Sequence, residues 1–300
     1  MLIAVILPLI AGGATLESEK LYGASKVRGS CLSRGVSARP VSMGEAFTAV
    51  ADDASAVSWN PAGLGRVSSL SAVATYDAVG QDVGITYLAT AWPASRVTPG
   101  LAVTVVNLGS YDARDRDGVK TGSVNLMSVV LAGAFAFSNP EILGKGWTGL
   151  GAEVVSEPVG GSVFGFTAGG VHQLVERVDL GWAVQHVGTD GEGFSLPAVA
   201  KLGLGLVAED GVRVSTDLGY RFISGEPMAS VGGEMSPVSN ITLRAGYRYS
   251  RDGRVNGSNG FAAGLGFRYS SLDLDYAYQP FGELATSHRF ALVYRGEKAK

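Results

Sequence analysis

The feature that most constrains this chain is a hydropathy period of two residues that begins near Ser69 and continues almost to the C-terminus. Large apolar residues alternate with glycine, small polar residues and charges, as in 212–222, 243–249 and 272–279. Such alternation predicts β-strands, because successive side chains of a strand point to opposite faces. We count about fourteen strands, with twelve as the alternative count. They are expected near 69–77, 82–92, 99–111, 123–137, 147–157, 162–172, 177–188, 198–208, 211–223, 227–235, 239–251, 259–270, 271–280 and 287–295.

The composition favours a membrane barrel over a soluble sheet. Charged residues are 17% of the chain, 43 residues are glycine and the mean hydropathy is +0.20. Beyond the N-terminus, no run of about eighteen apolar residues exists that would form a helical span. A soluble β-sandwich is the alternative, but the polar faces of these strands contain too little Lys and Glu for ordinary solvent exposure. We therefore predict an all-β transmembrane antiparallel barrel of about fourteen strands.

The width of such a barrel decides which face points inward. Fourteen strands enclose a lumen that side chains of the wall do not fill, so the apolar face is expected to contact lipid and the polar face to line the lumen. We expect these charges to form ion pairs or to contact a plug; the alternative is a polar lining that selects solutes. The predicted lumen-facing charges are Arg213, Asp217, Arg221, Arg244, Arg248, Asp273 and Asp275. Trp92 and Trp147 lie at predicted strand ends, where aromatic girdles occur, although each is also compatible with ordinary packing.

The N-terminal part of the chain divides into two regions. Residues 1–14, MLIAVILPLIAGGA, have the length and composition of a signal-peptide core, and the alternative is a buried N-terminal segment. Residues 15–68 are expected to form a lumen hatch, followed by the barrel at 69–295 and a tail at 296–300. Cys31 is the single cysteine, which excludes a disulfide framework. A lipid-modified Cys31 is the alternative, but its flanking residues fit a lipidation site poorly.

The segment from Met43 to Val67 neither alternates like a strand nor is apolar enough for lipid. Because it precedes the first strand, we expect it to fold back into the lumen. A short helix is predicted to begin near Met43, with Ser42 as its cap and Glu45 at its third position, and to end before Pro61. The residues predicted to form this hatch motif are Met43, Gly44, Asp52, Asp53, Asn60, Pro61 and Ala62.

Within this motif, Asp52 and Asp53 are expected to pair with lumen arginines or loop amides; an ordinary polar turn is the alternative. Asn60, Pro61 and Ala62 are expected to form the corner that joins the hatch to the barrel wall.

The sequence offers little support for an enzyme or a metal site. The three histidines are far apart, no nucleophile elbow occurs, and the G-x-G-x-x-G match at 144–149 has no βαβ context. Asp115 and Asp117 resemble half of a calcium loop but lack its remaining carboxylates. We expect no cofactor, and a formal charge of −3 gives no argument for nucleic acid.

Three stretches resemble the PorV/PorQ family of outer-membrane proteins, which are relatives of the FadL long-chain fatty-acid transporters. They are ARPVSMGEAF at 38–47, ADDASA at 51–56 and WNPAGL at 59–64. The closing segment LDYAYQPFGEL at 274–284, with HRF at 288–290, is similar as well. The resemblance covers nearly the whole chain after residue 14 and implies a fourteen-stranded barrel with an N-terminal hatch.

The resemblance also implies a location and a set of functions. The location is the outer membrane of a Gram-negative bacterium, with outer-membrane lipids and the barrel assembly machinery as partners. The leading hypothesis is a channel for small hydrophobic or amphipathic molecules, gated by the hatch, with an apolar pocket beside it. In transport members of the family the ligand leaves sideways through the wall. The alternatives are an accessory protein that binds secreted cargo in type IX secretion and a purely structural barrel.

Overall fold

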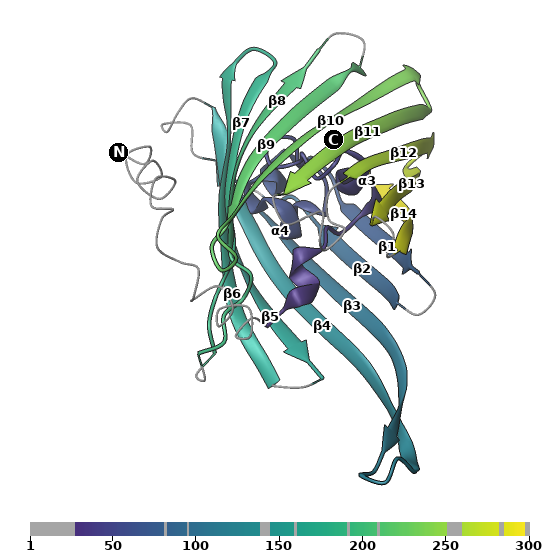
Figure 1. The fold of residues 1–300 in the computed structure, drawn as a ribbon. Helices are drawn as coiled ribbons and strands as arrows, with labels where there is room; N and C mark the ends of the chain where they lie inside the picture. The colour runs from purple at the N-terminus through teal and green to yellow at the C-terminus, as the bar shows by residue number, and fades with distance from the viewer. Residues whose placement is uncertain are drawn as a thin grey trace.

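Fourteen antiparallel strands close into a barrel in the computed structural model, which describes residues 28–80, 83–94, 96–138, 145–158, 161–190, 193–208, 211–250, 260–281 and 285–297 (Figure 1). Each strand pairs with its neighbours in sequence, and β1 closes the barrel on β14 from Ser71↔Arg295 to Val79↔Ser287. The predicted fold class is confirmed, and the count is fourteen rather than twelve. The strands are β1 Ser71–Val79, β2 Val83–Ala91, β3 Val97–Arg114, β4 Lys120–Ser138, β5 Gly146–Glu157, β6 Gly161–Val175, β7 Val178–Val187, β8 Val199–Val207, β9 Arg213–Arg221, β10 Glu226–Val238, β11 Ile241–Ser250, β12 Gly260–Tyr269, β13 Leu272–Phe281 and β14 Ala285–Arg295.

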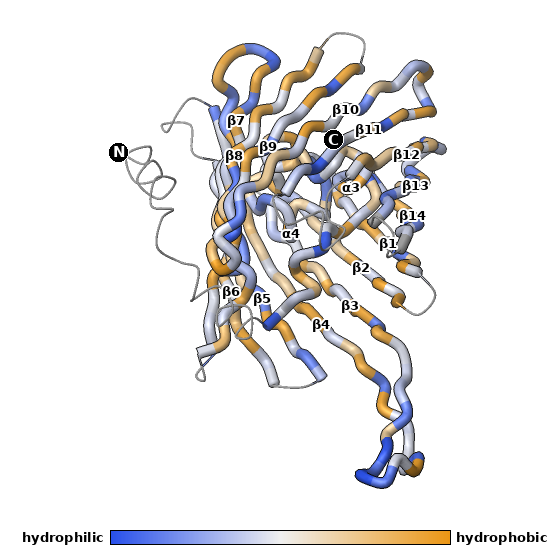
Figure 2. Tube along the Cα trace, viewed as in Figure 1, coloured by the Kyte–Doolittle hydropathy of each residue, from blue (hydrophilic) through white to orange (hydrophobic). Residues whose placement is uncertain are grey.

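The two faces of the wall differ as the alternation predicts. Large apolar side chains point outward: Leu218 is 65% exposed and Phe164 is 64% exposed. On the same strand as Leu218, Asp217 and Ser215 are buried on the inner face. Figure 2 shows hydrophobic and hydrophilic positions alternating along the strands. Apolar residues outside and charges inside exclude the soluble sandwich, in which the apolar face would be buried.

The connections differ in length at the two ends of the barrel. At one end, two-residue turns join β6 to β7, β10 to β11 and β12 to β13, and the longest connection at this end is the seven-residue one between β4 and β5. At the other end lie the long 188–198 connection between β7 and β8 and the hairpin of β3 and β4, which projects beyond the other strands (Figure 1). Bacterial barrels have short turns on the periplasmic side and longer loops outside. We call these the short-turn end and the long-loop end.

Short helices of the N-terminal segment, residues 28–67, lie inside the ring of strands (Figure 1). They are η2 Ser30–Ser33, α3 Ala38–Ser42, α4 Ala56–Trp59 and η3 Pro61–Arg66. Their apolar side chains form the main core cluster together with small wall residues such as Ala89, Ala102 and Ala134. Within the described ranges, no helix has the length and apolar character needed to cross a bilayer.

The predicted helix at Met43 is wrong. Helix α3 ends at Ser42, whose hydroxyl donates a hydrogen bond to the Arg39 carbonyl (2.8 Å) instead of capping a following helix. Gly44 and Glu45 then adopt left-handed backbone angles, with φ of 62° and 66°, which a right-handed helix does not permit. The prediction that helix ends before Pro61 is correct, because α4 stops at Trp59.

Trp147 follows the alternative expectation, ordinary packing. The α-carbon of Gly65 lies so close to its indole that a β-carbon there would be 2.0 Å from the ring. Trp147 therefore faces the lumen and is not part of an outer aromatic girdle. Trp92 is 39% exposed just after β2, as a girdle residue would be. The predicted signal peptide at residues 1–14 lies outside the described residues.

Candidate functional site

The N-terminal segment lies directly against glycines of the wall. A β-carbon at Gly246 would lie 2.1 Å from the carbonyl carbon of Met43. A β-carbon at Gly232 would lie 2.1 Å from the Met43 carbonyl oxygen. Gly44 approaches the backbone of Tyr247 in the same way. Only glycine lets two backbones approach so closely. Similar contacts continue around the barrel: Ser42 meets Gly264, Thr48 meets Gly181 and Gly203, Val50 meets Gly205, Asn60 meets Gly169, Pro61 meets Gly149 and Val57 meets Gly100.

Asn60 connects three parts of this region through one buried amide. Its side-chain nitrogen donates to the carbonyls of Thr48 (2.7 Å) and Gly170 (3.2 Å), and its side-chain oxygen accepts from Ala62 N–H (3.1 Å). The last bond caps η3, whose first residue is Pro61, a favoured position for proline. Asn60, Pro61 and Ala62 therefore hold the segment against β5 and β6, and the chain enters the wall only later, at Ser71.

Asp52 and Asp53 belong to a buried charge network centred on Arg39. The Arg39 guanidinium contacts Asp52, Asp53 (3.2 Å) and Glu234 of β10 (2.8 Å). Arg213 of β9 reaches Asp52 at 2.9 Å and Glu234 at 3.2 Å. The expected pairing of Asp52 with a lumen arginine is therefore present. Burial alone would raise the pKa of Asp52, but Arg39 and Arg213 outweigh burial and hold it well below its usual range.

Two further predicted charges bind the N-terminal segment. Asp217 of β9 accepts hydrogen bonds from Phe47 N–H (3.1 Å), Thr48 N–H (3.0 Å) and the Thr48 hydroxyl (2.6 Å). Arg248 of β11 forms an ion pair with Glu45. Burial opposes ionisation of Glu45, but Arg248 and its other cationic neighbours lower the pKa of this carboxyl overall.

The remaining predicted charges pair within the wall. Arg244 contacts Asp275 (2.6 Å) and Glu234 (3.1 Å), and Arg221 contacts Glu226 (3.3 Å). Asp273 is bound by two arginines near the short-turn end, Arg268 (2.7 Å) and Arg295 (3.0 Å). All seven predicted lumen charges therefore have partners, as expected for ion pairs and contacts with a plug rather than for an open polar lining.

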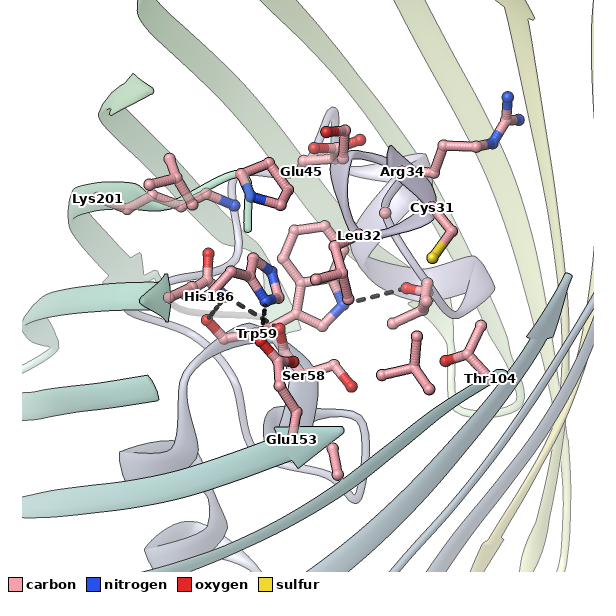
Figure 3. A pocket seen from close by; sticks show the side chains of 18 of the residues that line it. Cys31, Leu32, Arg34, Glu45, Ser58, Trp59, Thr104, Glu153, His186 and Lys201 are labelled. Carbon is pink, nitrogen blue, oxygen red and sulfur yellow. Dashed lines mark hydrogen bonds and ion pairs between the residues drawn. The ribbon is translucent and has the colours of Figure 1, made fainter. Parts of the chain in front are cut away.

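A small cavity lies between the N-terminal segment and the wall (Figure 3). Its lining residues Glu153, His186 and Arg221 lie toward the strand ends at the long-loop end. Its apolar lining comes from η2 and Val36 on one side and from β3, β4, β8 and β10 on the other. In Figure 3, His186 and Lys201 lie on one side of Trp59 and Cys31 on the other. The apolar lining residues include Leu32, Val36, Val130, Val199 and Met228, and the charged ones are Arg34, Glu45, Glu153, Lys201 and Arg221.

The cavity volume is about 70 Å³. An engineered protein cavity that binds benzene measures about 150 Å³. The site as it stands is therefore too small for even one aromatic ring, and a ligand of that size needs part of the lining to move.

Trp59 is the central side chain of this cavity. Its indole N–H donates to the Val36 carbonyl (3.0 Å), and its ring packs edge-on against Phe47 at 6.1 Å. Lys201 of β8 places its ammonium 4.7 Å from the Trp59 ring centroid, a cation–π contact. Cys31 lies opposite, and burial raises the pKa of its thiol to about 11.

The wall beside the cavity is irregular between β6 and β7. The pairs Phe166↔Val187 and Ala168↔Val184 leave one extra residue on β7, a β-bulge. His186 lies in this bulge with φ of 58°, and its Nδ1 is 2.7 Å from Glu153 of β5. Both side chains line the cavity.

Sequence reasoning missed Arg39, Glu234, Lys201, Trp59 and the Glu153–His186 pair as site residues. The period-two alternation could have placed Glu234 and Lys201 in the lumen, since each is a charge on the polar face of a predicted strand. Arg39 and Trp59 lay in the stretches that carry the family resemblance but were not assigned a role. No pattern indicated the bulge at His186.

On the side of the N-terminal segment toward the short-turn end is a more polar hollow of about 720 Å³, lined by Asp52, Arg66, Lys145, Asp179 and Arg213 among others. Arg66 crosses from η3 to Asp179 of β7 (2.7 Å). The N-terminal segment therefore separates this hollow from the apolar cavity.

Comparison with known proteins gives matches only at the level of structure. No family model matches the sequence, and no curated protein is significantly similar to it. The toluene transporter TbuX of Ralstonia pickettii superposes with a TM-score of 0.65 and 14% identity, over 88% of this chain and 99% of that one. The fold of this chain is thus similar to that of a hydrocarbon transporter.

Two further structures give the same result. The toluene transporter TodX of Pseudomonas putida has a TM-score of 0.61 at 13% identity, over 86% of this chain and 99% of that one. A FadL homologue of Pseudomonas aeruginosa has a TM-score of 0.58 at 14% identity, over 85% and 97% of the two chains. The likeness to FadL-type barrels is therefore confirmed as a likeness of fold. Membership of the PorV/PorQ family remains a prediction.

Proposed function

We propose that this protein is an outer-membrane channel for small hydrophobic or amphipathic molecules, without enzymatic activity. The observation that carries the proposal is the cavity with apolar walls between the N-terminal segment and the barrel. It lies inside a barrel whose structural neighbours include toluene transporters. A polar pore would need an open, water-filled path, whereas here the lumen is occupied and its charges are paired.

We further propose that the N-terminal segment has a fixed and a moving part. Residues 38–64 are almost entirely buried and lie against wall glycines; we call them the partition. Residues 28–36 are mostly half-buried and cover the cavity; we call them the arm. Ser37, with φ of 66°, marks the boundary between them. Movement of the arm enlarges the cavity, while the partition blocks the direct path to the short-turn end.

Ligand passage then follows the inner faces of β3 and β4 from the long-loop end to the cavity. Val106, Thr104 and Val130 lie along this path. The bulge at His186 is the proposed place of exit, because the ladder between β6 and β7 is interrupted there. His186 is held at this point by hydrogen bonds to the side chains of Glu153 (2.7 Å) and Thr167 (3.4 Å).

Filling the cavity tests the proposal. Val130→Trp places an indole in the space, so uptake of radiolabelled toluene by cells that depend on this channel should fall by at least about tenfold. Val129→Trp is the matched control, because Val129 is the neighbouring residue on the opposite, lipid-facing side of β4. Equal uptake by both variants and by the wild type, with the barrel correctly assembled, would contradict transport through this cavity.

A further inference from the structure

The hairpin of β3 and β4 continues as a free two-stranded ribbon beyond the barrel wall. β2 pairs with β3 only as far as Asn107, and β5 pairs with β4 only from Val129 onward. The two strands nevertheless stay paired with each other up to Arg114↔Lys120. Among the residues that the structure describes, seven of β3 and nine of β4 therefore have a hydrogen-bonded neighbour on one side only. At about 3.4 Å per residue, the ribbon extends more than 20 Å past its neighbours.

The ribbon is ordered at its tip by its own side chains. The Asp115 carboxylate accepts hydrogen bonds from Asp117 N–H (3.0 Å) and Val119 N–H (2.9 Å), and Gly118 has φ of 80° as the turn requires. Almost every residue from Ser110 to Asn125 is exposed. An isolated two-stranded hairpin is marginally stable in water, and a third strand or a packed face normally supports it.

The two free edges of the ribbon differ. The β3 edge carries the devices that prevent strand pairing: charges at Asp112 and Arg114, and a bulge between Asn107 and Ser110 with Gly109 at φ of 91°. The β4 edge over residues 122–128, GSVNLMS, has no charge and no proline. The extra residue of the bulge is on β3, so β4 itself stays regular. Such an edge presents a regular row of unpaired N–H and C=O groups.

A row of alternating backbone donors and acceptors is complementary to another extended polypeptide, and not to an acyl chain or a small apolar solute. A second copy of this chain fits less well. Two barrels in one membrane point the same way, so their β4 edges could pair only in parallel, which is the less stable arrangement. This inference rests on the proposed outer-membrane location: with the long-loop end outward, as in bacterial barrels, the edge faces the outside of the cell.

We propose that residues 122–128 of β4 bind an extended segment of a different protein outside the cell, which adds a third strand to the ribbon. Val124, Leu126 and Met127 supply side-chain contacts, and the main chain supplies the affinity. Lys120 and the charged tip limit the paired length to about seven residues.

The test uses the full-length protein in intact cells, in a Cys31→Ser background. A thiol-reactive benzophenone is attached to Asn125→Cys on β4 or, as a control, to Ser110→Cys directly opposite on β3. After illumination we expect a discrete protein adduct from position 125, and mass spectrometry should place the cross-link in one extended segment. A synthetic peptide of that segment should bind the purified protein.

Two matched variants test whether binding depends on the β4 edge and not on the β3 edge. Val124 and Tyr111 face each other across the ribbon and are similarly exposed, at 48% and 55%. Val124→Lys places a charge on the open edge and should weaken peptide binding at least about tenfold, whereas Tyr111→Lys should leave it unchanged.

Four outcomes would overturn the proposal. They are no adduct, equal adducts from both edges, an adduct of twice the chain mass (a second copy of this chain), and an adduct that protease does not remove (a lipid). Toluene uptake by the Val124→Lys cells reports separately on the transport proposal, since residue 124 lies outside the cavity.

Discussion

At the residue scale, Asn60 shows how one buried amide fixes the course of the N-terminal segment. The hydrogen bonds of its side-chain amide all go to backbone groups: Thr48 in the preceding turn, Gly170 in the wall and Ala62 in the following helix. Since the side chain is fully buried, water cannot replace these bonds when it is removed. Asn60 therefore acts as a connection between the partition and the wall and not only as a helix cap.

Asn60→Ala, alone or with Pro61→Ala, is expected to loosen the partition and leave the barrel assembled. Leaving these backbone groups unpaired costs about 1–3 kcal/mol of local stability. Hydrogen exchange of residues 46–64 should accelerate while heat-resistant mobility on gels, which reports the folded barrel, is retained. Asn125→Ala, at an exposed amide on the hairpin, is the control. Loss of the whole barrel would show that this corner is instead required for folding.

Asp52 gives the network around Arg39 a defined pH dependence. Arg39 and Arg213 lower the pKa of this carboxyl in the folded state. The ionised Asp52 therefore contributes its full stabilisation of the folded state above the unfolded pKa of about 4, and this stabilisation is lost as the pH falls below that value. Asp52→Asn should therefore destabilise the partition by about 2 kcal/mol at pH 7, and the difference from the wild type should shrink below about pH 4.

Hydrogen exchange of residues 46–64 in the two proteins, compared at each pH, measures this difference. A difference that stays constant from pH 7 to pH 3 would mean that Asp52 acts through its shape and hydrogen bonds and not through its charge.

At the element scale, glycines in the strands determine how closely the partition approaches the wall. Gly232 and Gly233 are neighbours on β10 and make a matched pair. A β-carbon at Gly232 would lie 2.1 Å from the Met43 carbonyl oxygen, whereas at Gly233 the nearest atom would be 3.3 Å away. Gly232 faces the lumen, and Gly233 faces the opposite side of the wall.

Gly232→Ala should displace the partition, and Gly233→Ala should not. We expect alkylation of Cys31 to be slow in the intact protein, because the thiol is half-buried and its pKa is raised, and we expect displacement of the partition to expose it. We expect alkylation of Gly232→Ala to be faster by at least about tenfold, and that of Gly233→Ala to match the wild type. The same slow rate in both variants would show that the partition does not depend on this close approach.

The strands could be predicted from the sequence because their information is local. Alternation of residue type determines which side chains face lipid, and it located all fourteen strands within a few residues, for instance 147–157 against the observed Gly146–Glu157. The lumen charges followed from the same alternation. The outer part of the ribbon, residues 112–122, was predicted as a loop, since it lacks the apolar face that a membrane strand requires.

The course of the partition could not be predicted, because it depends on contacts with many strands at once. A cap-like Ser42 and Glu45 favoured a helix from Met43, but the close approach to Gly232 and Gly246 requires a left-handed turn at that point. The direction of Trp147 was left open for the same reason: its place at a strand end is visible in the sequence, but its contact with Gly65 is not.

At the scale of the whole molecule, the barrel is closed by two layers with different properties. The partition is buried, hydrogen-bonded and tied to the wall by ion pairs from Arg39, Glu45 and Asp52. The arm is only half-buried and covers a cavity of about 70 Å³. A ligand the size of an aromatic ring enters a cavity of this size only if part of the lining moves, and in the proposed function the arm is the part that moves.

Locking the arm tests this most directly. Cys31 in the arm packs against the wall cluster that contains Val130, and both residues line the cavity. In a Val130→Cys variant, oxidation should join the arm to β4. Toluene uptake should then fall by at least about tenfold and recover on reduction, while Cys31→Ser combined with Val130→Cys should be insensitive to oxidant. Undiminished uptake with the Cys31 bond shown to be formed would contradict the moving arm.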